Sequence, residues 1–144
     1  MLVQQILKSK GDDGVVTIPP GTSVAKAAEL LSARRIGAVI VSPDGKRVAG
    51  ILSERDIVRE LGRRGVGILA EPVDSLMTAK IIGCTRNETT DEVLGRMTDG
   101  RFRHMPVMEG DQMIGLISIG DVVKARLMEL AAEKDVLEGM IKGF

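Results

Sequence analysis

The stretch GILSERD, residues 50–56, decides how this chain is interpreted, because its pattern returns as GLISIGD at residues 115–121. Each copy contains Gly, two apolar residues, Ser, two variable residues and Asp. Each follows a short apolar run and precedes apolar residues at helical spacing, which predicts a junction between a strand and a helix. The first N–H groups of a helix lack partners within the helix and carry partial positive charge. Such a junction can therefore hold a phosphate or a sugar hydroxyl.

The same residues also have a purely structural interpretation. A Ser followed three residues later by an acidic residue resembles a capping box, which helices use for stability alone. A single copy would favour that interpretation. Two copies at matching places in a duplicated unit, each after a Gly that lets another chain segment or a ligand approach the backbone, favour a pair of binding sites.

Composition argues against several classes of function. The 20 basic and 20 acidic residues give a net charge near zero, which does not support bulk attraction to nucleic acid or anionic membranes. Two Phe and no Trp or Tyr leave no stacking platform for single-stranded nucleic acid. The single cysteine, Cys84, suits a reducing compartment and a small buried side chain. Without a signal-peptide pattern or a membrane-length apolar run, we expect a soluble cytoplasmic protein.

The two halves of the chain repeat the same order of elements. Residues 3–7 and 73–77 predict short amphipathic turns, and strands are expected over 15–18 with a partner at 81–85. Thr22 or Ser23 caps a helix that matches one at Thr90. Strand pairs are expected at 37–41 with 48–52 and at 105–108 with 113–117. Residues 62–67 predict a mobile glycine-rich connection, and the long helix after Asp121 predicts a partner helix from a second copy.

This order predicts an α/β (α+β) fold with three parts. Residues 1–66 form a first repeat with its N-terminal helix and linker, residues 67–130 form a second repeat, and residues 131–144 form a C-terminal helical extension. Neither half is long enough to bury a convincing core alone. We therefore expect the halves to pack on each other about a pseudo-twofold axis, with the two Ser/Asp junctions in clefts between them.

With these motifs the chain resembles a tandem pair of cystathionine-β-synthase (CBS) domains, a Bateman module. The resemblance covers nearly the whole chain and rests on both Gly-to-Asp motifs and on the stretch 103–107. It implies a β-α-β-β-α fold in each half and a disc-like homodimer. It also implies a regulatory module that binds adenosine-containing ligands, such as AMP, ADP, ATP, S-adenosylmethionine or NAD(H), on behalf of an enzyme or a transporter.

The resemblance also implies which residues contact the ligand. Asp56 and Asp121 would accept hydrogen bonds from ribose hydroxyls, with Ser53 and Ser118 bonding phosphate or ribose nearby. The other implied contacts are Thr17, Ile18, Pro19, Arg35, Gly37, Ala38 and Arg55 in the first half, and Cys84, Thr85, Arg86, Arg103, His104, Met105, Pro106 and Ile119 in the second.

The two implied sites are not equivalent, because Arg103 and His104 stand where the first half has Gly37 and Ala38. Guanidinium and imidazole groups can donate to phosphate oxygens, so we expect one high-affinity site in the second half. A lone His beside an apolar strand is more often structural, and only the resemblance favours ligand contact for His104. A metal site is poorly supported, because one His and one Cys lie 20 residues apart with no second pair.

Two other functions compete with this interpretation. The chain could be a dimeric interaction scaffold with vestigial ligand pockets, although the Ser and Asp retained in both halves argue against it. It could also be an enzyme, but the sequence contains no apparent Ser/His/Asp set, metal cluster or Walker loop. We therefore expect no catalytic residues and no catalytic cofactor.

Overall fold

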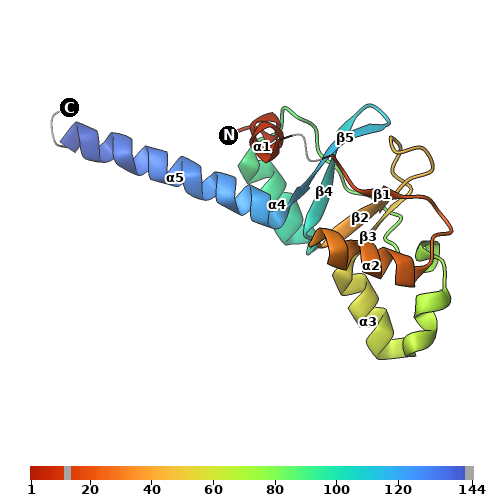
Figure 1. The fold of residues 1–144 in the computed structure, drawn as a ribbon. Coiled ribbons are helices and arrows are strands. Elements are labelled where there is room, and N and C mark those ends of the chain that lie inside the picture. The colour runs from red at the N-terminus through yellow and green to blue at the C-terminus, as the bar shows by residue number, and fades with distance from the viewer. Residues whose placement is uncertain (12–13, 142–144) are drawn as a thin grey trace. The chain divides into compact units, whose positions relative to one another are not determined.

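The computed structural model describes residues 1–11 and 14–141, which form a mixed α/β structure with five helices and two small sheets (Figure 1). The described residues fall into two compact units. Unit 1 contains residues 1–11, 83–108 and 115–141, and unit 2 contains residues 14–82 and 109–114. None of the described helices is both long enough and apolar enough to cross a bilayer.

Unit 2 is built on a three-stranded sheet. Strands β1 (Thr17–Ile18) and β2 (Ala38–Val41) pair in parallel, and β3 (Gly50–Ser53) pairs with β2 in the antiparallel direction. Helix α2 (Val24–Arg34) connects β1 to β2, and helix α3 (Glu54–Arg64) follows β3 directly. All four residues of β2 are buried, as expected for the central strand of a covered sheet.

The predicted start of α2 is confirmed, because Ser23 caps the helix and its hydroxyl accepts a hydrogen bond from the backbone N–H of Lys26. The helix buries Val24, Ala27 and Leu31 against the sheet. These positions are spaced by three and four residues and therefore lie on one helix face. The apolar pattern read from the sequence is thus the core face of unit 2.

The connection expected at residues 62–67 differs from the prediction. Helix α3 continues through Gly62 to Arg64, and Gly65, with φ of 81°, ends it. A 3-10 helix, η1 (Val66–Ala70), starts at the next residue, and its Ile68 is almost fully buried in the core of unit 2. This apolar anchor gives the segment a regular structure that its glycine content alone does not predict. A second 3-10 helix, η2 (Val73–Ser75), occupies the turn predicted at 73–77.

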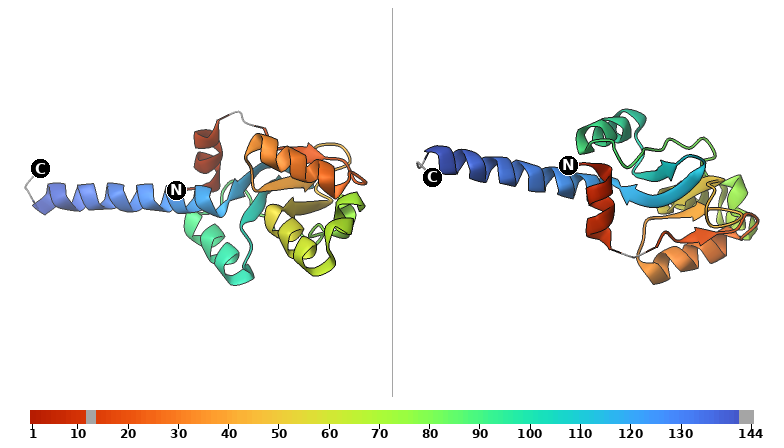
Figure 2. Two further views of the ribbon diagram at one scale, coloured as in Figure 1. Left: turned by 60° about the horizontal axis from the view of Figure 1, so that its bottom comes forward. Right: turned by 90° about the horizontal axis from the view of Figure 1, so that it is seen from above.

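Unit 1 contains the remaining elements. These are α1 (Val3–Lys10), α4 (Thr90–Gly100), β4 (His104–Glu109), β5 (Gln112–Ser118) and α5 (Ile119–Ile141). In both views of Figure 2, α1 and α4 lie beside the first half of α5, and the second half extends beyond them. Most of β4 and β5 belongs to unit 1, whereas residues 109–114 at the turn belong to unit 2, where Met113 N–H donates to the Lys46 carbonyl over 2.7 Å.

The strand predicted at residues 81–85 is reduced to a single bridge. Cys84 pairs in parallel with Val107, donating to the Pro106 carbonyl over 3.0 Å and accepting from Met108 N–H over 2.7 Å. Only Cys84 is buried among residues 81–85, and Ile82 is exposed. The segment therefore buries one side chain, whereas a longer strand in a half-covered sheet alternates buried and exposed side chains.

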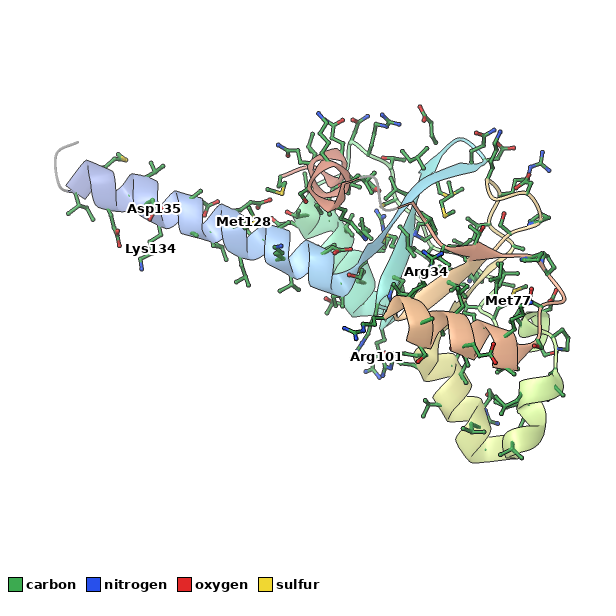
Figure 3. All side chains as sticks on the ribbon, viewed as in Figure 1. Arg34, Met77, Arg101, Met128, Lys134 and Asp135 are labelled. Carbon is green, nitrogen blue, oxygen red and sulfur yellow. The ribbon has the colours of Figure 1, made fainter. Side chains whose placement is uncertain are left out.

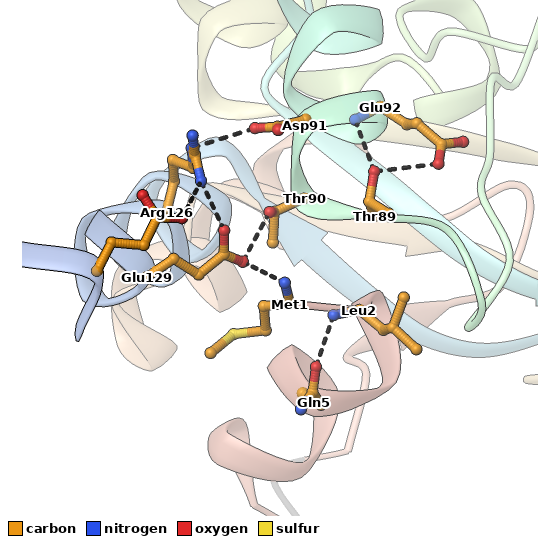
Figure 4. Close-up of polar contacts among 10 residues, drawn as sticks. Met1, Leu2, Gln5, Thr89, Thr90, Asp91, Glu92, Arg126 and Glu129 are labelled. Atoms are coloured by element: carbon orange, nitrogen blue, oxygen red, sulfur yellow. Dashed lines mark hydrogen bonds and ion pairs between the residues drawn. The ribbon is translucent and has the colours of Figure 1, made fainter. Parts of the chain in front are cut away.

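Glu129 connects the three helices of unit 1 (Figure 4). Its carboxylate accepts hydrogen bonds from the Thr90 hydroxyl over 2.9 Å and from Arg126 over 2.8 Å, and it pairs with the amino group of Met1. Arg126 also pairs with Asp91 at the start of α4 over 3.2 Å. These polar contacts fix the first half of α5 against α1 and α4.

The glycine that opens each motif admits a side chain from a distant turn. A Cβ atom added to Gly50 would lie 2.4 Å from the Met77 sulfur, and one added to Gly115 would lie 2.6 Å from Cδ2 of Leu7. The predicted close approach of another segment is therefore confirmed in both halves. Neither turn packs in the unit formed by the residues that follow it. Helix α1 precedes residues 14–82 of unit 2 but belongs to unit 1, and residues 73–77 precede residues 83–108 of unit 1 but belong to unit 2.

We predict that Gly115→Ala lowers the free energy of unfolding by about 1–3 kcal/mol, because the new methyl group overlaps Leu7. Urea unfolding of Gly115→Ala, Leu7→Ala and the double variant measures the coupling. The double variant should lose less stability than the sum of the two single variants. Gly95→Ala in α4, where a Cβ meets nothing within 4 Å, is the matched control and should be neutral or stabilising. An additive double variant would contradict the overlap.

Candidate functional site

The first candidate site lies at the β3–α3 junction of unit 2. Ser53 caps α3, and its hydroxyl accepts from Asp56 N–H over 3.2 Å. Oδ2 of Asp56 accepts in return from the N–H and the hydroxyl of Ser53, over 2.9 and 3.0 Å. Arg59, one turn further along α3, donates to Oδ1 over 3.0 Å. The buried carboxylate of Asp56 is thus held on both oxygens by groups from its own junction.

The second candidate site lies at the β5–α5 junction of unit 1 and repeats the capping geometry. Asp121 N–H donates to the Ser118 hydroxyl over 3.1 Å, and Ser118 N–H donates to Oδ2 of Asp121 over 2.8 Å. The structural interpretation of both motifs, a reciprocal capping box, is therefore confirmed. A capping role does not prevent a ligand from using the remaining acceptor positions of the carboxylate.

Sequence inspection did not identify Lys10 as part of the second junction. The Lys10 ammonium group, on α1, donates to Oδ2 of Asp121 and to the Leu116 carbonyl, both over 2.8 Å. These partners lie 111 and 106 residues away in the sequence, so no local pattern reveals them. An ammonium group has three N–H donors. Two are used here, and the Lys10 side chain is 35 % exposed, which leaves a donor for a further oxygen.

One backbone hydrogen bond joins each junction to the start of the neighbouring strand. In unit 2, Glu54 N–H donates to the Gly37 carbonyl over 2.9 Å. In unit 1, Ile119 N–H donates to the Arg103 carbonyl over 2.8 Å. The structure therefore places the backbone of Gly37 at the first junction and the backbone of Arg103 at the second.

The strand register separates other implied contacts from the junctions. Ser53 lies opposite Ala38 at one end of β2, whereas Ile18 lies opposite Val41 at the other end. Thr17 and Pro19 flank Ile18 and therefore also lie away from Ser53. The residues of this segment that lie closer to Ala38 are those before Thr17, and they were not among the ligand contacts predicted from the sequence. Cys84 shows the same displacement, because it pairs with Val107, three residues beyond His104.

The remaining implied contacts differ in their exposure. Met105 and Pro106 are buried in unit 1, so their side chains belong to its core. His104 and Ile119 are half-buried, and the exposed members are Arg35, Arg55, Thr85, Arg86 and Arg103. The second junction thus carries an exposed arginine at the position where the first has Gly37.

Two arginines end the preceding helices in an unusual conformation. Arg35, after α2, has φ of 54°, and Arg101, after α4, has φ of 57°. These are the only non-glycine residues with positive φ among those that the structure describes. Arg35 lies two residues before Gly37, and Arg101 lies two residues before Arg103. The carbonyls of Gly37 and Arg103 accept the backbone hydrogen bonds from the two junctions. Arg35 was singled out from the sequence, whereas its counterpart Arg101 was not.

The structure shows the state of the single cysteine and of the possible metal ligands among the described residues. Burial, followed by the nearby charge of Glu88, raises the pKa of the Cys84 thiol to about 12, so it remains a thiol at neutral pH. No group of three or more His, Cys, Asp or Glu side chains suited to a metal ion occurs within residues 1–11 and 14–141.

The pKa of Asp121 lies below its usual value. Burial raises it, but the hydrogen bonds from Lys10 and from Ser118 N–H lower it by more. A carboxyl group with a lowered folded-state pKa stabilises the protein above its unfolded pKa, and this contribution is lost as pH falls through the folded-state value. The Lys10 ion pair therefore stabilises the fold at neutral pH and not in acid.

We predict that Lys10→Met lowers the free energy of unfolding by about 1 kcal/mol near neutral pH, because it removes a partly exposed charged hydrogen bond. The loss should fade as pH falls through the folded-state pKa of Asp121. Urea titrations at several pH values measure both effects. Lys8→Met, an exposed lysine on the same helix, is the control. An equal loss for Lys10→Met at all pH values would argue against the ion pair.

Comparison with known proteins places this geometry in a family. The family model "CBS domain" matches residues 11–63 and 73–128. A mitochondrial CBS domain-containing protein of Arabidopsis thaliana, CBSX3, is 32% identical over 98% of this chain and 72% of its own length. The crystal structure of the CBS-domain protein ATU1752 from Agrobacterium tumefaciens is 45% identical, covers 88% of this chain and 99% of its own, and has a TM-score of 0.83.

Two more distant structures share the fold and contain ligands. The CBS domain protein PAE2072 of Pyrobaculum aerophilum, complexed with AMP, is 23% identical, with a TM-score of 0.77 over 92% of this chain and 99% of its own. The CBS domain pair of MJ0100, in complex with 5-methylthioadenosine and S-adenosyl-L-methionine, is 20% identical, with a TM-score of 0.77 over 90% of this chain and 98% of its own. By its two domain matches and its fold, this chain belongs to the CBS-domain family.

Proposed function

We propose that this chain is a regulatory CBS pair that binds an adenosine-containing ligand and signals energy or redox state to a separate protein. AMP, ADP, ATP and NAD(H) are the ligands we propose, and S-adenosylmethionine belongs to the same chemical class. The single observation that carries the proposal is the β5–α5 junction, where the Asp121 carboxylate, the Lys10 ammonium group and the backbone carbonyl of Arg103 meet one helix start. The AMP and S-adenosylmethionine complexes of the distant relatives support this class of ligand.

Each group at this junction has a chemical counterpart in a nucleotide. An ionised carboxylate offers only acceptors, which suits the two hydroxyl donors of a ribose. The remaining N–H of Lys10 and the guanidinium group of Arg103 suit phosphate oxygens, and the helix start adds partial positive charge. The Ser118 hydroxyl lies beside the carboxylate and can bond the same ligand. His104 is proposed as a second phosphate donor.

The two junctions should differ in affinity. Asp56 has both oxygens occupied by Ser53 and Arg59, and no arginine stands at the position of Gly37. Three of the roughly four acceptor positions of the Asp56 carboxylate are already used, so a ribose that offers two hydroxyl donors must displace a hydrogen bond there, which costs free energy. A ligand at Asp121 needs only to add to those present. We therefore propose one strong site at the β5–α5 junction and a weaker one at the β3–α3 junction, to which Arg35 and Arg55 contribute.

The proposal includes no catalytic step. Cys84 is a buried thiol, and Asp56 and Asp121 are capping carboxylates rather than an acid and base pair. We place the protein in the cytoplasm, since a single buried cysteine suits a reducing compartment. We further propose that the module acts as a homodimer, as the disc-like assembly implied by the resemblance requires.

A dimeric scaffold is the second candidate function. It is favoured by the exposed apolar side chains of α5, among them Leu127, Leu137 and Ile141. Such a surface supports association whether or not a ligand binds. The two functions separate experimentally, because only the first requires Asp121.

Isothermal titration of the nucleotide-stripped protein with AMP, ATP, S-adenosylmethionine and NADH tests the proposal. At least one ligand should bind saturably, and Asp121→Ala should weaken it at least tenfold by removing the ribose acceptor. Asp135→Ala, an exposed acidic residue far along α5, is the matched control and should bind like the wild type. Thermal unfolding checks that both variants fold. Failure of the wild type to bind any of the four ligands would favour the scaffold.

A further inference from the structure

Most of α5 has no contact that explains its apolar side chains. Among its described residues only Val122 and Ala125 are buried, both in its first two turns. Further along, Leu127 is 61 % exposed, Leu137 58 % and Ile141 84 %. Figure 3 shows Lys134 and Asp135 extending from a part of the helix that no other element of unit 1 accompanies. Exposing apolar side chains to water is unfavourable, and a partner that covered this helix face would remove that free-energy cost.

Five of the exposed apolar side chains and Lys134 form one narrow row, the α5 stripe. Its members, spaced alternately by four and three residues, are Val123, Leu127, Leu130, Lys134, Leu137 and Ile141. This spacing is the a and d pattern of a coiled coil, and it keeps one seam facing a partner helix. The five apolar members are all between 41 % and 84 % exposed. The stripe lies more than a third of a turn from the face that carries Val122 and Ala125, so the buried face of the helix and the stripe are different faces.

We propose that the α5 stripe pairs with the α5 stripe of a second copy of this chain, with the two helices antiparallel. The inference deepens the homodimer just proposed by naming its surface and direction, and it does not depend on nucleotide binding. A twofold axis near residue 132 pairs positions whose numbers add to 264. Val123 then meets Ile141 of the second copy, Leu127 meets Leu137, and Leu130 meets Lys134. This register uses every member of the stripe.

The single charged member of the stripe selects this direction. Parallel helices in register would place Lys134 against Lys134 at the seam and Glu133 near Glu138, which are like charges. In the antiparallel register the two Lys134 side chains are separated, and each covers a Leu130 with its stem while its ammonium group reaches water. Lys134 is 75 % exposed and lies 3.8 Å from Glu138 in the same helix, so its head already points toward solvent.

Charges beside the stripe agree with the same register. The antiparallel arrangement places Lys124 of each copy near Glu138 of the other, which gives two attractive pairs. It also brings the two Glu133 side chains together at the axis, and Arg126, 4.0 Å from Glu133 in the same chain, offsets that repulsion. The balance favours antiparallel over parallel pairing. It also identifies the occupant as a second copy, because the stripe and its flanking charges are complementary to themselves.

Sedimentation velocity of the full chain tests the surface. Leu130→Glu places a charge in the seam and should lower the average mass of the assembly from that of a dimer toward that of a monomer at a fixed protein concentration. Val136→Glu is the matched control: Val136 is 63 % exposed on the same helix but lies off the stripe, so the mass should not change. A wild-type monomer, or equal masses for both variants and the wild type, would overturn the proposal.

Two further variants test the direction. Lys124→Glu and Glu138→Lys should each weaken the association, and the double variant should restore it. Ala131→Cys, next to the proposed axis, should form a disulfide-linked dimer under oxidation, whereas Val136→Cys should not. The native Cys84 is buried and should not interfere. Absence of both the cross-link and the charge-swap rescue would overturn the antiparallel arrangement.

Discussion

The close approach of a side chain to a motif glycine is the constraint on which the rest of the structure depends. Leu7 lies over Gly115 and Met77 lies over Gly50, where a β-carbon would leave no room. Gly50 is the first residue of β3 and Gly115 lies in the middle of β5, and each strand leads directly into a capped helix. The same contact therefore places a helical turn beside each candidate site. In unit 1 that turn also supplies Lys10.

The two junctions share a design and differ in how their carboxylates are held. Asp56 is satisfied by Ser53 and Arg59, all within seven residues of chain. Asp121 shares its Oδ2 between a local N–H and a lysine from the other end of the sequence. A local cap can form with the helix itself, whereas the Lys10 contact forms only when α1 has docked. The electrostatics of the second site therefore report the state of the N-terminal helix.

Sequence patterns predicted most of the fold because its determinants are local. The spacing of Val24, Ala27 and Leu31 defines a helix face, and Ser23 marks its start. The patterns failed where a distant contact decides the outcome. Buried Ile68 orders a segment that its glycines describe as a linker, and Cys84 forms only one bridge where a strand was expected. The family resemblance was confirmed, whereas its ligand contacts remain predictions.

The candidate site shows the same division. Ser118 and Asp121 are recognisable because their spacing within one helix turn fixes their geometry. Lys10 and Arg101 are not, because one acts across 111 residues and the other is distinguished only by its backbone conformation. Register also escapes prediction: the pairing of Ile18 with Val41 places it away from Ser53, and no pattern within either strand reveals that.

The placement of the two short turns has a consequence for how the two repeats depend on each other. Each turn packs over the motif glycine of the other repeat: Leu7 lies over Gly115, and Met77 lies over Gly50. A repeat expressed with only the turn that precedes it would therefore lack the side chain that covers its glycine. A single chain that contains both repeats therefore supplies each turn to the unit that needs it without the help of a second molecule.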